Sequence, residues 1–99
     1  MKKPDGVYLF PTYYIVNDTN KGDEEARGCA VSSSREIRLS EDYHLEDQKQ
    51  SMLHEVIHLI LEMGGYREQD EQIVDVLSLG ILSMIRGNSD LIKWLEEVK

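Results

Sequence analysis

The chain has 99 residues, of which 40% are hydrophobic and 30% charged, a composition that fits one globular domain spanning residues 1–99. Its formal net charge of -8 argues against a nucleic-acid ligand, because binding to the phosphate backbone requires clustered Lys and Arg. No stretch is apolar and long enough for a signal peptide or a membrane span, so we expect a cytoplasmic protein without a membrane partner. The single cysteine, Cys29, excludes a disulfide framework and a cysteine-based zinc site, and we expect it to be a half-buried strand residue.

The first forty residues favour strands. Residues 7–17 are aromatic and β-branched and are divided by Pro11, while residues 28–32 and 36–40 favour two further short strands. Residues 18–27 are polar and contain a glycine, so we expect an exposed hairpin loop there. The predicted product is a small, mostly antiparallel sheet of about three strands.

The remainder of the chain favours three helices. The first follows an acidic entry at residues 45–48 and should end near Met63, because two glycines follow it. The second should begin between residues 67 and 70 and continue to Arg86; residues 73–85 are apolar on most sides, which predicts the buried centre of the fold. The third is an amphipathic helix after Ser89. The predicted fold class is therefore α+β.

The first helix carries the pattern His-Glu-x-x-His at His54, Glu55 and His58. Two histidines four residues apart lie on one helical face, so both imidazoles can reach one metal ion, and the intervening glutamate is placed to take a proton from a water molecule. Apolar residues recur around the motif at helical spacing, which supports an amphipathic helix. The alternative is that these are ordinary surface or core histidines of such a helix.

A catalytic zinc usually takes three protein ligands and a water, so a third ligand is needed. The candidates are His44 and the acids of the second helix. A short turn makes the two helices antiparallel neighbours, which brings Glu71 alongside His58 and favours a His-His-Glu site. Asp75, one turn further on, could accept the free ring N–H of a ligand histidine. The alternative for Glu71 is a solvated acid that stabilises the positive end of the helix.

The motif His54-Glu55-Val56-Ile57-His58, followed by Glu71-Gln72-Ile73-Val74-Asp75, resembles the gluzincin metallopeptidases. The size and element order are similar to those of minigluzincins and of ImmA/IrrE-like phage and bacterial metallopeptidase domains. The resemblance implies zinc on the two histidines and Glu71, with Glu55 as general base. It also implies a peptide lying antiparallel to an edge strand, expected at residues 36–40. An electrophile for the transition state would come from Tyr66 or His44, for which turn packing or surface exposure is the alternative.

The function expected from these residues is zinc-dependent hydrolysis of peptide bonds in a peptide or protein substrate. One alternative is a non-catalytic interaction module in which zinc staples a small core, and in that case Glu55 has no proton to transfer. A second alternative is a metal-free helical adaptor. The sequence alone does not predict an oligomeric state.

Overall fold

The computed structural model describes residues 2–18 and 28–98 of the chain. Strands β1 (Gly6–Leu9), β2 (Thr12–Asp18), β3 (Gly28–Val31) and β4 (Glu36–Leu39) are followed by helices α1 (Leu45–Met63), α2 (Glu71–Gly87) and α3 (Ser89–Glu96). A short 3-10 turn, η1 (Ser32–Ser34), joins β3 to β4. The α+β class is confirmed, whereas the loop predicted at residues 18–27 lies almost wholly outside the described residues.

The sheet has four strands in the order β1-β2-β4-β3, slightly more than the expected number of about three, and it is mostly antiparallel as expected. Strands β1 and β2 form a hairpin around Pro11, which separates them, and β3 and β4 are also antiparallel. The pairing of β2 with β4 is parallel. Strand β4 occupies a central position because its alternating apolar residues, Ile37 and Leu39, are the most deeply buried of the sheet.

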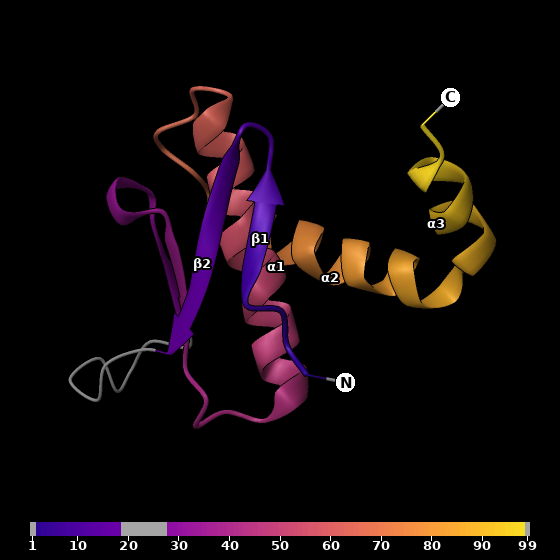
Figure 1. Cartoon of the computed structure of the whole chain (residues 1–99), viewed down its shortest axis with the longest axis horizontal. Coiled ribbons are helices and arrows are strands. Elements are labelled where there is room, and N and C mark those ends of the chain that lie inside the picture. Colours follow the sequence, from indigo (N-terminus) through magenta and orange to yellow (C-terminus); the bar gives the residue numbers. More distant parts are fainter. Residues whose placement is uncertain (1, 19–27, 99) are drawn as a thin grey trace.

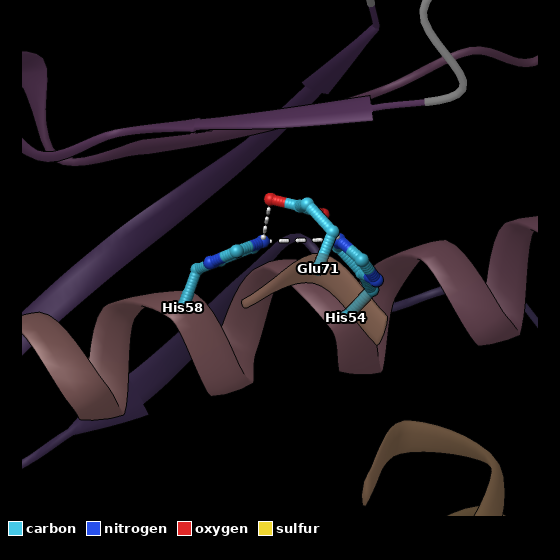
Figure 2. A group of neighbouring side chains, drawn as sticks. All are labelled: His54, His58 and Glu71. Carbon is cyan, nitrogen blue, oxygen red and sulfur yellow. Dashed lines mark hydrogen bonds and ion pairs between the residues drawn. The ribbon is translucent and has the colours of Figure 1, made fainter. Parts of the chain in front are cut away.

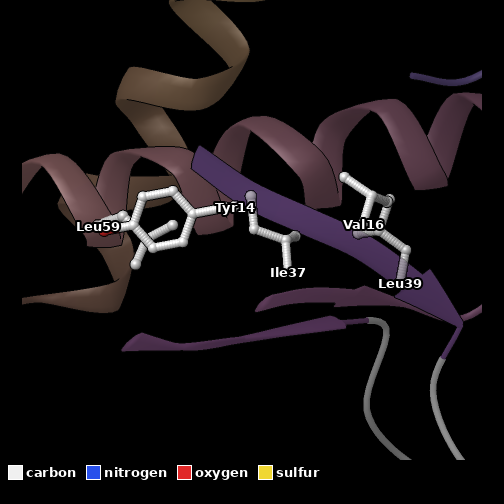
Figure 3. Packing of buried hydrophobic residues seen from close by; sticks show 5 residues of the cluster. All are labelled: Tyr14, Val16, Ile37, Leu39 and Leu59. Carbon is white, nitrogen blue, oxygen red and sulfur yellow. The ribbon is translucent and has the colours of Figure 1, made fainter. Parts of the chain in front are cut away.

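The core lies between one face of the sheet and α1. Figure 3 shows Tyr14 and Val16 of β2, Ile37 and Leu39 of β4, and Leu59 of α1 packed together. Alternation along the two strands directs these side chains to the same face, where each fully buried aliphatic group contributes about 2 kcal/mol. Ile57, on the other side of α1 from Leu59, is also buried, so α1 is covered on more than one side.

The turn after α1 fixes the start of α2. Gly65 adopts a positive φ of 90°, and the N–H groups of Gly65 and Tyr66 donate to the carbonyls of Glu62 and Leu61, which closes the helix end. Asp70 then caps α2, because its carboxylate accepts hydrogen bonds from the N–H groups of Gln72 and Ile73. The turn at Gly65 and the N-cap at Asp70 together bring the first turn of α2 back beside α1.

Helix α2 is not the buried centre expected from its apolar sequence. Among its residues only Val74 and Ser78 are buried, because one side of the helix packs on α1 while the other side remains exposed. Figure 1 shows α2 extending away from α1 and the sheet, with α3 turned upward at its far end. A two-pronged ion pair between Arg86 and Glu46, with N···O distances of 2.7 and 3.0 Å, joins the end of α2 to the start of α1. In the described part of the chain, no helix is both long and apolar enough to cross a membrane.

Candidate metal centre

His54 and His58 project from the same face of α1, one turn apart. Their Nε2 atoms are 3.0 Å apart. Both side chains are 19% exposed, so the rings lie near the surface but are mostly covered by protein. The helix spacing alone produces this convergence, because residues four apart lie one above the other. The two nitrogens thus face a common point.

Glu71, the first residue of α2, supplies a carboxylate to that point. Its Oε2 atom lies 2.8 Å from Nε2 of His54, and its Oε1 atom lies 3.0 Å from Nε2 of His58. Figure 2 shows the three side chains converging from the two helices. Two ligand atoms bound tetrahedrally to zinc are separated by about 3.3 Å, so small outward movements would admit an ion. His54, His58 and Glu71 therefore form a group that can hold a metal ion.

Both histidines are oriented through their second ring nitrogen. The Nδ1 atom of His54 lies 2.7 Å from Oδ1 of Asp75, and Nδ1 of His58 lies 2.5 Å from Oε1 of Gln69. Because these oxygens accept the Nδ1 protons, each Nε2 atom keeps its lone pair for a metal. The amide of Gln69 is itself fixed, since its Nε2 group donates to the backbone carbonyls of His58 and Tyr66.

The surroundings of His58 raise its pKa when no ion is bound. Burial lowers the pKa of His58, but the hydrogen bond to Gln69 and the negative charge and hydrogen bond of Glu71 outweigh it, so the pKa is raised. A metal cation competes with that proton, because coordination requires the neutral ring. Metal binding at this site should therefore weaken as the pH falls.

Glu55 lies beside the two histidines and faces β3. Burial raises the pKa of its carboxyl group, and the carboxylate of Glu71 acts in the same direction, while the histidines and a hydrogen bond from the Ala30 N–H lower it. Gly28 borders the same carboxylate: an added Cβ would lie 3.8 Å from the Glu55 Cγ atom and only 2.8 Å from the Arg38 carbonyl oxygen. A half-buried carboxylate with a raised pKa is suited to accept and release a proton.

The site opens into a cleft of about 440 Å³ between α1, α2 and the beginning of β3. The residues that line it are Gly28, Gln50, Ser51, His54, Glu55, Asp75, Ser78 and Leu79. The candidate metal ligand His54 and the candidate proton acceptor Glu55 therefore line the same solvent-accessible cleft.

The edge of the sheet beside this cleft is β3, not the segment 36–40 expected from the sequence. Strand β4 is enclosed between β2 and β3, so its backbone groups are used within the sheet. In an antiparallel pair the N–H and C=O of one residue point to the same side. Since the Ala30 N–H points to Glu55, the backbone groups of Ala30 and of Gly28, two residues earlier, face outward.

The structure does not bring His44 or Tyr66 to the group formed by His54, His58 and Glu71. His44 precedes α1 and is exposed, about 15 Å along the helix axis from His54. Tyr66 is 64% exposed in the turn after α1, where its ring lies against Gly64. His44 and Tyr66 therefore lie at the surface, which is the alternative that the sequence offered for them. Cys29 is half-buried in β3, as expected.

Sequence reasoning missed Gln69 and the backbone of Ala30. A signal for Gln69 existed, because a ligand histidine needs an acceptor for its second N–H and the segment between the helices must pass close to His58. Nothing in the local pattern indicated Ala30, since its contact with Glu55 depends on how the sheet docks on α1. Comparisons with family models, curated proteins and solved structures give no match for this chain.

Proposed function

We propose that the protein is a zinc-dependent peptidase. The observation that carries the proposal is the position of Glu55, which stands between the group of His54, His58 and Glu71 and the outward-facing edge of β3. Two imidazoles and one carboxylate are a ligand set typical of catalytic zinc, and they leave a fourth position open. Zinc is preferred over a harder cation because two of the three donors are nitrogens.

The chain supplies the proton transfers of this reaction. A bound zinc ion supplies a Lewis acid that activates water and polarises a carbonyl group. Glu55 accepts the proton of the attacking water and passes it to the leaving amine, and burial, which raises the pKa of Glu55, strengthens its affinity for that proton. Asp75 and Gln69 hold the histidine rings in place during the cycle.

The substrate in this proposal is an extended peptide segment. The outward C=O groups of Gly28 and Ala30 and the N–H of Gly28 offer a strand edge on which such a segment can pair, while the Ala30 N–H is held by Glu55. The cleft beside this edge lies next to Glu55, so a carbonyl of the paired segment reaches the reacting groups. The shallow cleft and the small domain favour a flexible partner segment over a folded one.

The test compares wild-type protein with Glu55→Gln. We expect the wild type to bind zinc and to cleave members of a quenched fluorescent peptide library. The variant should bind zinc equally but lose cleavage by at least about a hundredfold, the usual effect of a general base. A zinc-loaded wild type that cleaves no peptide, or a variant that cleaves equally well, would contradict the proposal.

A second function is a zinc-stapled interaction module. It is favoured by the loose attachment of α2, of which only Val74 and Ser78 are buried among the described residues, so that a metal joining Glu71 to α1 would stabilise the helix pair. This function predicts a large gain in thermal stability on zinc binding and no cleavage. The Glu55→Gln comparison separates the two functions.

A further inference from the structure

The outward face of α2 is apolar over its whole length. Ile73, Leu77 and Met84 are between 37% and 57% exposed on the side that does not contact α1. Monomeric proteins rarely leave so continuous an apolar surface in water. In α3, which follows the far end of α2 (Figure 1), Leu91, Trp94 and Leu95 are exposed as well.

The spacing of these residues is that of a helix-packing seam. Ile73, Leu77, Gly80 and Met84 follow one another at steps of four, three and four residues, as a and d positions do in a coiled coil. Gly80 lies close to the middle of α2, and a Cβ added there would meet nothing within 4 Å. A glycine at the centre of an exposed apolar seam allows another helix to approach closely.

The total exposed surface has room for such a contact. The chain exposes 7573 Å², whereas a compact monomer of its mass would expose roughly 5,800 Å². The excess is roughly 1,800 Å², and a standard interface takes about 800 Å² from each partner. This surplus belongs to the whole chain, and the exposed apolar residues of α2 and α3 contribute to it, as a surface left for a partner would.

We propose that a second copy of this chain covers this face. Two α2 helices pack antiparallel in a symmetric dimer whose axis lies midway along the seam, between Leu77 and Gly80, which places Ile73 of each copy beside Met84 of the other and Leu77 beside Gly80. The near-symmetry of the seam about its centre suits a twofold axis, where the same patch serves both subunits.

The charge distribution permits this pairing. Despite the net charge of -8, Asp75 is the one charged residue between Glu71 and Arg86, and it faces His54 on the opposite side of α2. Two acidic copies can thus meet without like charges inside the seam. Because Asp75 and Ser78 line the cleft on the α1 side, the dimer leaves the cleft open, and the proposal does not depend on peptidase activity.

The test is the mass of the full chain measured by sedimentation equilibrium. We expect the wild type to have twice the monomer mass of 11.4 kDa, and Leu77→Arg to have the monomer mass. Ile15→Arg is the matched control, since Ile15 is a similarly exposed apolar residue on the sheet, and it should remain a dimer. A monomeric wild type, or larger aggregates without a discrete dimer, would overturn the proposal.

Gly80→Leu is a second variant that tests the dimer even if Leu77→Arg fails to fold. The new side chain enters open space in the single copy and improves the helix propensity, so the helical circular-dichroism signal should persist. It also blocks the close approach of a second α2, so the mass should fall to that of the monomer. A Gly80→Leu protein that remains dimeric would show that the seam is not the interface.

Discussion

Asp75 and Glu71 hold opposite nitrogens of the same imidazole: Oδ1 of Asp75 lies 2.7 Å from Nδ1 of His54, and Oε2 of Glu71 lies 2.8 Å from Nε2. The two acids are one turn apart on α2, so a single helical face fixes both ends of a ring that belongs to α1. The ring can therefore be presented to a metal in one orientation and one tautomer.

Removing the Asp75 carboxylate should weaken metal binding without removing a ligand. We expect Asp75→Ala to lower the affinity for zinc by about tenfold to a hundredfold, because the orienting acceptor for His54 is lost. Competition with a chromophoric chelator measures this. Asp90→Ala, which removes an exposed acid of α3, is the control and should keep the wild-type affinity. Equal zinc affinities for Asp75→Ala and wild type would show that Asp75 does not contribute to metal binding.

Gln69 should contribute both to zinc affinity and to the stability of the metal-free protein. Gln69→Ala should also lower zinc affinity by about tenfold or more, because His58 loses its acceptor. In addition, the metal-free protein should lose about 1–2 kcal/mol of unfolding free energy in urea, since two backbone carbonyls lose their donor. Gln72→Ala, in the first turn of α2, serves as the matched control. An unchanged affinity in Gln69→Ala would show that the His58 ring is held by other contacts.

The turn between the helices depends on the positive φ of Gly65. Gly65→Ala should destabilise the protein by about 1–2 kcal/mol, because a Cβ is strained at a φ of 90°. Gly64→Ala is an adjacent control: its φ is -83° and a Cβ there meets nothing closer than 3.4 Å. Thermal unfolding of both variants measures the difference. If the two substitutions cost the same, the left-handed residue is not what fixes the turn.

Glu36 should make the stability of the sheet depend on acid pH. Hydrogen bonds from Asn17 and then Arg38 lower the pKa of Glu36 from 4.5 to about 2. Since the folded-state pKa is depressed, the ionised group stabilises the fold above pH 4.5, and this contribution is lost as the pH falls through about 2. Urea unfolding over this range should show a steeper loss for wild type than for Glu36→Gln. Glu96→Gln on α3 should retain the wild-type slope, and parallel curves for all three proteins would contradict the assignment.

Periodicity explains why part of the site was predictable. His54 and His58, and likewise Glu71 and Asp75, are four residues apart within one helix, so their shared faces follow from local geometry alone. The glycines after Met63 indicated the turn that brings the two pairs together. The α+β class followed from the change of pattern from strand-like to helical residues near residue 45.

The features that were not predicted depend on contacts distant in sequence. The insertion of β4 between β2 and β3, and hence the edge position of β3, is decided by which strand buries its apolar face best. The exposure of α2 could not be inferred from its apolar composition, because burial requires a partner element and hydrophobicity only favours one. Gln69 was not predicted because an amide in a polar turn has no distinguishing pattern of its own; only the need of His58 for an acceptor pointed to this turn.

His54, His58 and Glu71 should bind one zinc ion together. Metal analysis of the purified protein, combined with zinc K-edge X-ray absorption, measures whether they do. We expect one zinc per chain, with two imidazole nitrogens and a carboxylate oxygen at about 2.0–2.2 Å, and a weaker zinc affinity with a changed spectrum in Glu71→Ala. A protein that binds no zinc, or a Glu71→Ala protein with wild-type affinity and spectrum, would show that these three residues do not form a zinc site.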